Sequence, residues 1–328
     1  MSERALRWGL LSTARINRAL IPPLRASERN QLTAVASRSL EAAEAYATEW
    51  NIPRALGSYA ALLADPEIDV IYNPLPNHLH AEWTIRALQA GKHVLCEKPM
   101  ALTLDELDRM AAAAQEAHCV LAEAFMYRHQ PQTLKVKELV ESGALGSLRL
   151  IKGAFTFTLA NPQDYRLSPD MGGGSIWDVG CYPVSYARLI VGREPLDVFG
   201  WQVPGATGID ETFTGQMRFA GDVLAQFDCG FASPYRTHIE IVGSEAALNI
   251  PVPFKPGTRE EILLTRGYER ETIEIHGPDL YVGEVEDMAD AVLLGKSPRV
   301  SLADSRGNVA AILALLESAR LGKPVLWS

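Results

Sequence analysis

Short apolar segments alternate with helical patterns over the first 124 residues. Short apolar runs bounded by turn residues are typical of strands that are buried on both faces, and they predict strands at residues 7–11, 32–36, 70–72, 93–95 and 120–124. Between them, apolar positions with helical spacing predict helices at residues 40–50, 59–63, 81–90 and 102–117. This alternation predicts one parallel sheet with covered faces.

The pattern changes in the second part of the chain. After a helix predicted at 132–141, segments that often alternate apolar and polar residues predict successive strands at residues 148–157, 216–220, 223–231, 237–242, 247–250 and 261–265. Successive strands favour an antiparallel or mixed sheet with one face partly open. Helices at residues 283–294 and 304–321 complete an α+β domain, and the polar residues 161–171 are predicted to form a loop. We therefore predict domains at residues 1–124 and 125–328.

Composition narrows the function classes. The chain has 328 residues, of which 47% are hydrophobic and 22% charged, and this suits two globular domains. Its net charge of -9, without a basic cluster, argues against a nucleic-acid surface. No apolar run reaches the ~18 residues of a membrane span, and the N-terminus lacks the apolar core of a signal peptide. Four cysteines without a CxxC pair favour reduced thiols and a cytoplasmic location over a zinc site or disulfides.

The first strand is followed by a turn of small residues and then by a helix. This order opens a nucleotide-binding βαβ unit, in which the backbone approaches a pyrophosphate near the helix N-terminus. Ser12 and Ala14 stand where the usual fingerprint has its first two glycines. The hydroxyls of Ser12 and Thr13 could donate to phosphate instead, although a plain β-α turn explains the pattern equally well.

Ser37 and Arg38 stand at the end of the second predicted strand. A chain specific for NAD often carries Asp or Glu here, to bind the ribose 2′-hydroxyl. A hydroxyl and a guanidinium suit a 2′-phosphate instead. Within a dinucleotide-binding fold, these residues favour NADP over NAD, while an ordinary exposed arginine remains the alternative.

Residues 73–80 form an irregular, proline-containing turn after the third predicted strand. Ligands bind at such carboxyl ends in doubly wound sheets. His78 and His80 could suggest a metal, but the sequence shows no third cluster of ligands, so a capping or ligand-contacting role is predicted.

Glu97-Lys98-Pro99 follows the strand predicted at 93–95. The proline ring excludes the α region for Lys98 and holds it extended, and a cis Lys98–Pro99 bond would tighten the turn. A lysine fixed in this way can bind a substrate oxygen or lower the pKa of a neighbouring acid. A surface lysine on a β-α turn is the alternative.

Residues 172–183, Gly-Gly-Gly-Ser-Ile-Trp-Asp-Val-Gly-Cys-Tyr-Pro, are the most informative stretch of the second domain. They open a helix predicted at 175–191, in which Pro183 costs a hydrogen bond. Asp178 and Tyr182 are four residues apart and share one helical face. A carboxylate beside a phenol can hold a hydroxylated substrate and move its proton. Alternatively, Tyr182 is a packed aromatic residue and Asp178 a first-turn charge.

The nucleotide turn, Glu97-Lys98-Pro99 and the run from Gly172 to Tyr182 resemble, in this order and at these spacings, the Gfo/Idh/MocA oxidoreductases. This is the family of glucose–fructose oxidoreductase and inositol dehydrogenase, and the resemblance covers almost the whole chain. It implies an α/β Rossmann domain followed by an α+β domain with a large, mostly antiparallel open sheet. It also implies a cleft between the domains and a homodimer or homotetramer formed through the open sheets.

The resemblance implies catalytic roles for Lys98, Asp178 and Tyr182. Many members have His at the position of Tyr182, and Tyr is found in the branch with glucose–fructose oxidoreductase, dimeric dihydrodiol dehydrogenase and NADP-dependent xylose dehydrogenases. The positions that match cofactor-contacting ones are Ser12, Thr13, Ala14, Arg15, Ile16, Ser37, Arg38, Leu75, Asn77, His80, Glu97 and Lys98, with Arg128 and Arg166 as further candidates for cofactor or substrate contact.

These expectations predict an NADP(H)-dependent oxidoreductase acting on a sugar or sugar-like polyol, without a metal. Tyr182 would accept the hydroxyl proton during oxidation. The reference pKa of a phenol is ~10, and a nearby Lys98 ammonium would lower it. Asp178 would orient the substrate. Two alternatives remain: a trans-dihydrodiol dehydrogenase, and a regulator of sugar metabolism that binds NADP without catalysis.

Overall fold

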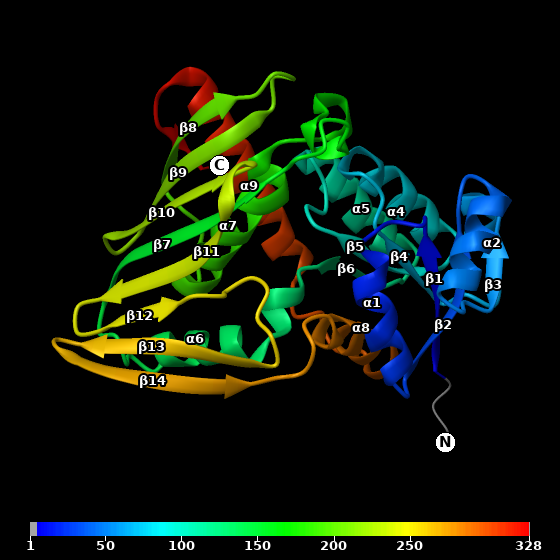
Figure 1. Cartoon of the computed structure of the whole chain (residues 1–328), viewed down its shortest axis with the longest axis horizontal. Helices are drawn as coiled ribbons and strands as arrows, with labels where there is room; N and C mark the ends of the chain where they lie inside the picture. Colours follow the sequence, from blue (N-terminus) through cyan, green and yellow to red (C-terminus); the bar gives the residue numbers. More distant parts are fainter. Residues whose placement is uncertain (1–4, 328) are drawn as a thin grey trace. The chain divides into compact units, whose positions relative to one another are not determined.

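The computed structural model describes residues 5–327 and divides into two compact units. Unit 1 contains the described chain up to Met126 together with Tyr281–Arg306, and unit 2 contains Tyr127–Leu280 together with the described chain from Gly307. Figure 1 shows this division by colour: the orange segment Tyr281–Arg306, late in the chain, lies with the blue and cyan elements of unit 1. The sequence predicts one second domain at residues 125–328, whereas Tyr281–Arg306 belong to unit 1.

Unit 1 is built on a six-stranded sheet of order β3-β2-β1-β4-β5-β6. Every neighbouring pair in it is parallel, which confirms the predicted Rossmann-type sheet. Its strands are β1 (Leu6–Leu11), β2 (Asn30–Ala36), β3 (Arg54–Leu56), β4 (Val70–Asn73), β5 (His93–Glu97) and β6 (Leu121–Ala124). Their carboxyl ends therefore lie at one edge of the sheet, where the candidate loops begin.

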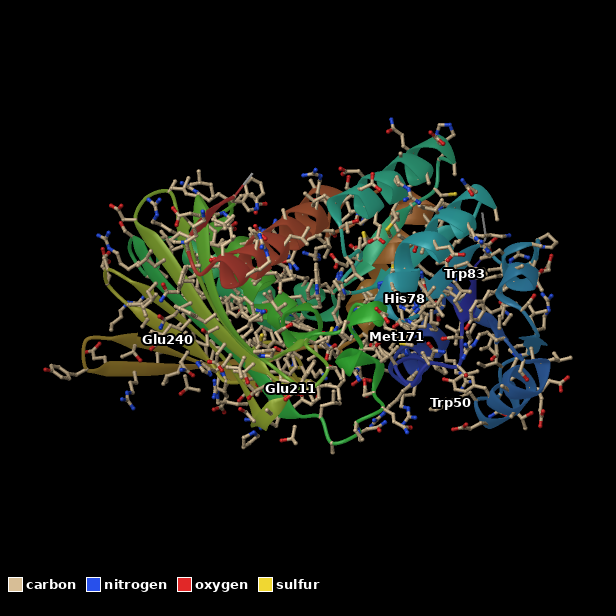
Figure 2. All side chains as sticks on the ribbon, turned by 90° about the horizontal axis from the view of Figure 1, so that it is seen from above. Trp50, His78, Trp83, Met171, Glu211 and Glu240 are labelled. Atoms are coloured by element: carbon tan, nitrogen blue, oxygen red, sulfur yellow. The ribbon has the colours of Figure 1, made fainter. Side chains whose placement is uncertain are left out.

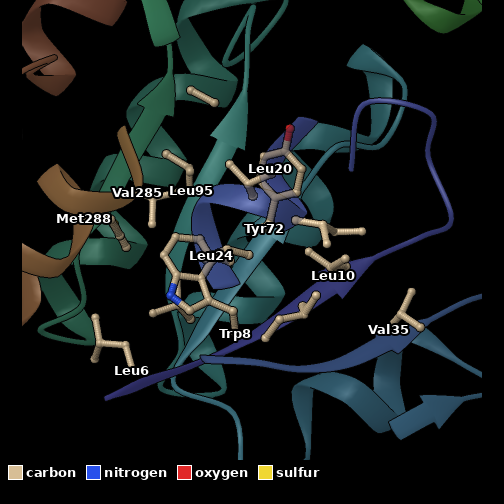
Figure 3. Close-up of a cluster of buried hydrophobic side chains, with 14 of the residues drawn as sticks. Leu6, Trp8, Leu10, Leu20, Leu24, Val35, Tyr72, Leu95, Val285 and Met288 are labelled. Carbon is tan, nitrogen blue, oxygen red and sulfur yellow. The ribbon is translucent and has the colours of Figure 1, made fainter. Parts of the chain in front are cut away.

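Six helices accompany this sheet in unit 1: α1 (Asn17–Ala26), α2 (Leu40–Glu49), α3 (Tyr59–Leu63), α4 (His80–Gln89), α5 (Leu104–Glu116) and α8 (Val282–Leu294). Helix α8 comes from far along the chain, yet Val285 and Met288 are buried in the same core as Trp8 and Tyr72 (Figure 3). Burying such side chains contributes about 1.5–3 kcal/mol each. This core explains why α8 belongs to unit 1.

Unit 2 contains a nine-stranded sheet of order β14-β13-β12-β11-β7-β10-β9-β8-β15. The β10–β7 pair is parallel and the other pairs are antiparallel, so the prediction of a large, mostly antiparallel sheet is confirmed. Its strands are β7 (Leu148–Thr158), β8 (Asp197–Pro204), β9 (Asp210–Phe219), β10 (Val223–Gly230), β11 (Ala232–Gly243), β12 (Ala247–Ile250), β13 (Arg259–Arg266), β14 (Glu269–His276) and β15 (Val325–Leu326).

Several strands of this sheet were not predicted, among them β8 and β14. Strand β14 is largely exposed and rich in charge, which is how edge strands commonly avoid unwanted pairing, and its apolar alternation is reduced to Ile273 and Ile275. In β8 the last four residues are exposed, so the alternation is lost there as well. Strand β9 begins at Asp210, before the predicted start at 216.

Helices α6 (Pro131–Glu141), α7 (Cys181–Val191) and the later part of α9 (Leu302–Leu321) belong to unit 2. Helix α7 contacts β7 and β10, and Leu315 of α9 packs on Gly200 and Gly215 of the sheet. The opposite face carries exposed side chains such as Trp201 and Leu224. Residues 161–171, predicted as a loop, contain the 3-10 turns Tyr165–Leu167 and Pro169–Met171 (Met171 is labelled in Figure 2).

No helix within residues 5–327 is long and apolar enough to cross a membrane. In the same part of the chain, no group of three or more His, Cys, Asp or Glu side chains is placed to hold a metal ion.

Candidate active site

The turn between β1 and α1 bends at Ser12, whose φ of 89° is unusual for a residue other than glycine. Buried Asn17, the first residue of α1, donates from Nδ2 to the Ser12 carbonyl at 2.8 Å and stabilises this turn. The predicted contact residues Thr13, Ala14, Arg15 and Ile16 lie in the turn, at the positive end of the α1 dipole. The turn therefore has the backbone bend that a glycine usually supplies, and it fits a pyrophosphate. Sequence reasoning missed Asn17.

Arg38 is exposed just after β2, and Ser37 before it donates its backbone N–H to the Leu56 carbonyl at 3.0 Å. Arg38 has no ion-pair partner among the described residues. Burial raises the pKa of Tyr59, and the Arg38 guanidinium acts in the opposite direction, so the two side chains are close enough to interact. The Tyr59 ring meets Trp83 of α4 edge-on at 5.0 Å between ring centroids (Trp83 is labelled in Figure 2). Tyr59 is a second residue that sequence reasoning missed.

The loop after β4 contains the predicted contacts Leu75, Asn77 and His80, all of which are buried. The His80 ring bridges two carbonyl oxygens, with Nε2 at 2.7 Å from that of Leu75 and Nδ1 at 2.8 Å from that of Pro99. Burial lowers the pKa of His80 to about 4, and the two carbonyls act against this effect. Both ring nitrogens are thus committed to the protein. His80 holds the 75–80 loop against the Glu97-Lys98-Pro99 turn.

The Glu97-Lys98-Pro99 turn leaves β5 with a cis Lys98–Pro99 bond, and the Glu97 and Lys98 side chains are half-buried. Glu97 accepts a hydrogen bond from the Tyr72 hydroxyl, and its other oxygen lies 3.3 Å from the Lys98 backbone N–H. These contacts fix the carboxylate next to the lysine. The structure thereby brings Glu97, Lys98, Leu75 and His80 into one cluster in unit 1.

Buried Glu123 supports the same turn from β6. One of its oxygens accepts the Met100 backbone N–H at 3.0 Å, and the other accepts the Ser305 hydroxyl at 2.6 Å. Since Met100 follows Pro99 directly, Glu123 holds the chain on the far side of the lysine.

A second buried acid, Glu284, lies on the first turn of α8 and is 2% exposed. Neither of its carboxyl oxygens has a hydrogen-bond partner among the described residues. Burial, followed by the charges of Glu97 and Asp287, raises the pKa of Glu284 well above its usual range. Burial thus favours the protonated form of Glu284, and Glu97 is close enough for its charge to add to this effect. Its proximity depends on a contact between distant segments, which no local sequence signal reports.

In unit 2, the glycine run makes a tight entry to a helical turn. Gly172 and Gly174 have φ values of 75° and 126°, and a side chain on Gly173 would collide with the carbonyls of Arg166 and Ser168. The predicted continuous helix is corrected by the structure: Ile176–Gly180 is a π-helix, and the α-helix begins at Cys181. Short π segments are frequent at functional sites. Asp178 therefore lies on the π turn and Tyr182 on the first turn of α7.

Asp178 forms an ion pair with Arg166, whose Nε lies 2.9 Å from Oδ2. Arg166 also binds Asp164, with its Nη1 atom 3.1 Å from Oδ2. Burial acts to lower the pKa of Arg166, but the attractions of Asp178, Tyr165 and Asp164 together outweigh it, so this pKa is raised. The structure thus brings Arg166 to Asp178 and anchors the 164–167 turn to the helix.

Tyr182 is 3% exposed, and its ring lies among aromatic neighbours. Its ring centroid is 5.3 Å from that of Phe155, 5.4 Å from Phe254 and 5.8 Å from Tyr127. This packing fixes the direction of the phenol. Arg128 is buried as well and donates to the Ser185 hydroxyl at 3.0 Å, which places it beside the following turn of α7.

Two family models match the chain. A model described as "Oxidoreductase family, NAD-binding Rossmann fold" matches residues 6–125, and one described as "GFO/IDH/MocA C-terminal domain" matches residues 133–249. The chain belongs to the Gfo/Idh/MocA oxidoreductase family. This membership confirms the resemblance seen in the sequence and identifies the protein as an oxidoreductase.

Members of the Gfo/Idh/MocA family with full-length similarity include a D-xylose 1-dehydrogenase (NADP(+)) from Haloferax volcanii, 38% identical, with 97% of this chain and 98% of that protein covered. A trans-1,2-dihydrobenzene-1,2-diol dehydrogenase from Danio rerio is 32% identical, with 99% and 98% covered. A solved 3-ketoreductase from Actinomadura kijaniata, in complex with NADP and TDP-benzene, has a TM-score of 0.91 and 30% identity, with 96% and 98% covered.

Proposed function

We propose that this protein is an NADP(H)-dependent dehydrogenase or reductase that acts on a hydroxyl or carbonyl carbon of a sugar or sugar-like polyol. The observation that carries this proposal is the paired placement of Asp178, held by Arg166, and Tyr182 on successive helical turns. A carboxylate suits substrate hydroxyls, and a fixed phenol suits proton transfer. The xylose dehydrogenase from Haloferax volcanii supports the sugar class.

NADP fits the residues of unit 1. The Ser12 bend and the N-terminus of α1 suit the pyrophosphate, and the exposed Arg38 with Ser37 suits a 2′-phosphate. Residues 75–80 and Glu97 would hold the nicotinamide half. When bound, NADP supplies the hydride chemistry of the reaction. The names of two relatives include NADP, which supports the same choice.

The remaining steps belong to the protein. Tyr182 accepts the proton of the reacting hydroxyl in oxidation and returns it in reduction. Lys98 binds a substrate oxygen, and its ammonium polarises the carbonyl in the reverse direction. Asp178 accepts hydrogen bonds from a neighbouring hydroxyl and orients the carbon that reacts.

The first test is a panel of D-xylose, D-glucose and trans-1,2-dihydrobenzene-1,2-diol, each with NADP⁺ and NAD⁺, followed at the absorbance of the reduced nicotinamide. We expect turnover of an aldose with NADP⁺. Turnover of the diol alone would favour the second candidate, which the Danio rerio relative supports. NADPH binding without turnover of any compound would favour a non-catalytic regulator instead.

We further propose that two or more copies associate through the exposed face of the unit 2 sheet. Trp201 is 62% exposed and Leu224 is 49% exposed on this face, an unusual apolar surface for a monomer. Lys152 and Glu240 form an ion pair there at 2.8 Å, so the face carries both signs of charge, as a self-associating surface requires (Glu240 is labelled in Figure 2).

Light scattering coupled to size exclusion tests this association. Trp201→Glu and Leu224→Glu should give monomers, whereas Tyr268→Glu, at an exposed turn between β13 and β14, should leave the assembly unchanged. A wild-type monomer would contradict the proposal.

We also propose a cytoplasmic location, because all four cysteines are free thiols, as is typical of a reducing compartment.

A further inference from the structure

A buried aspartate lies directly behind the candidate catalytic turn. Asp210, the first residue of β9, is 5% exposed. Its Oδ2 atom accepts two hydrogen bonds, from the Ser175 hydroxyl at 2.7 Å and from the Ile176 backbone N–H at 2.7 Å. Ser175 and Ile176 begin the π-helix that carries Asp178. The other carboxyl oxygen of Asp210, Oδ1, lies so close to Gly174 that a side chain at residue 174 would collide with it.

We propose that Asp210 is a positioning residue for catalysis, whose negative charge fixes the π turn so that Asp178 and Tyr182 hold their working geometry. This proposal rests on the function proposed above. Charge-assisted hydrogen bonds are about twice as strong as neutral ones, so the ionised carboxylate holds the turn more firmly than the neutral acid does.

Burial raises the pKa of Asp210 to about 6, and the bonds from Ser175 and Ile176 act in the opposite direction. A carboxyl whose pKa is raised on folding is stabilising below its unfolded pKa, and that contribution is lost as the pH rises through about 6. The ionised form thus lowers stability at neutral pH. A neutral side chain such as Asn could accept the Ile176 bond without this cost, so a purely structural role does not explain an acid here.

The groups that face Asp210 are few. The turn contributes the Ser175 hydroxyl and the Ile176 backbone N–H. Strand β10 contributes the Cys229 thiol, whose Sγ atom lies 3.6 Å from the Ser175 Oγ atom. Burial, followed by the charge of Asp210, raises the pKa of Cys229 well above its usual range. The thiol therefore stays neutral, and a change in the charge of this cluster near pH 6 belongs to Asp210.

The proposal predicts a distinct pH profile. In the wild type, kcat should fall by roughly tenfold to a lower plateau below pH 6, because protonation weakens both bonds. D210N resembles the protonated acid, so its kcat should lie at the lower plateau at every pH, without a step. The Kd for NADPH should remain at the wild-type value, because Ser12, Arg38 and Glu97, which are proposed to bind the cofactor, belong to unit 1.

Ser175→Ala supplies an independent test that does not depend on how D210N folds. The Ser175 bond lowers the pKa of Asp210, so its removal should move the step in kcat to higher pH. Hydrogen exchange of the peptide spanning residues 172–182, corrected for intrinsic rates, should show the same step in wild type without any substrate. In D210N, hydrogen exchange of this peptide should be fast at all pH values.

Asp65→Asn is the matched control, because Asp65 is also a buried carboxylate, accepts the Glu67 N–H at 2.8 Å, and lies in unit 1. It should lose stability and keep the step in kcat. A step that persists in D210N, or exchange that does not depend on pH, would overturn the proposal. If D178N, Y182F and D210N all keep full turnover, the proposed function itself fails. If D178N and Y182F lose turnover while D210N keeps the wild-type turnover and pH profile, the proposed function stands and the inference about Asp210 fails.

Discussion

Glu284 makes the stability of unit 1 depend on pH. Its pKa is raised well above the usual range, chiefly by burial, and Glu97 and Asp287 add to this. The unfolded carboxyl ionises near its ordinary value, whereas the buried one keeps its proton. Stability is therefore fully present below the unfolded pKa and is lost as the pH rises toward the folded pKa. Within that window the free energy of unfolding falls by ~1.4 kcal/mol per pH unit.

Glu284→Gln removes this dependence, because an amide has nearly the shape of the neutral acid and does not titrate. As the pH rises from 5.5 toward the folded pKa, the unfolding free energy of the variant should therefore rise relative to the wild type, by ~1.4 kcal/mol per pH unit. The other groups near the site, Tyr72 and Tyr281, also have raised pKa values and stay neutral over this range.

Urea unfolding at several pH values, followed by fluorescence, measures the difference. Glu116→Gln is the control, because Glu116 is exposed on α5 of the same unit and should leave the pH dependence unchanged. Parallel wild-type and Glu284→Gln curves across this range would refute the reasoning. They would mean that the buried carboxyl is already ionised.

Three further predictions concern the proposed cofactor residues Arg38 and Ser12 and the ion pair of Arg166 with Asp178. Arg38→Ala should weaken NADPH binding about tenfold or more and leave NADH binding unchanged, as measured by fluorescence titration. An equal loss of affinity for both nucleotides, or the same loss in the control Arg109→Ala at an exposed arginine, would contradict a contact between Arg38 and the 2′-phosphate. Ser12→Gly should raise the unfolding free energy by about 1 kcal/mol, because φ of 89° strains a serine, and a less stable variant would show that its hydroxyl matters more. Arg166→Met should lower kcat/KM about tenfold at unchanged NADPH affinity, with partial recovery in Arg166→Lys; an equal loss of cofactor affinity would assign Arg166 to the nucleotide instead.

The parallel sheet could be predicted because its strands are apolar on both faces, as in residues 7–11 and 70–72. The position of α8 could not, since Val285 and Met288 would suit any core, and the choice of unit 1 depends on contacts with residues such as Trp8. Strand β14 was missed because its exposed, charged residues leave only Ile273 and Ile275 as alternating apolar positions.

In the candidate site, too, some residues could be predicted from the sequence and others could not. Lys98, Asp178 and Tyr182 stand in local motifs, so the sequence indicates them directly. Asp210 and Glu284 interact with neighbours that are distant in the sequence, Ser175 and Glu97. An isolated acid in a strand or helix carries no signal of that pairing. The π-helix at Ile176–Gly180 was also beyond a pattern based on regular helical spacing.

Lys98 and Tyr182 are the two residues on which the proposed oxidoreduction of a sugar-like substrate depends. The most direct measurement compares the turnover of wild type, Lys98→Met and Tyr182→Phe on an aldose with NADP⁺, with the Kd for NADPH measured on the same preparations. We expect both variants to bind NADPH and to lose turnover by at least about a hundredfold, as expected for loss of a proton-transfer group. Wild-type turnover in both variants would contradict the account.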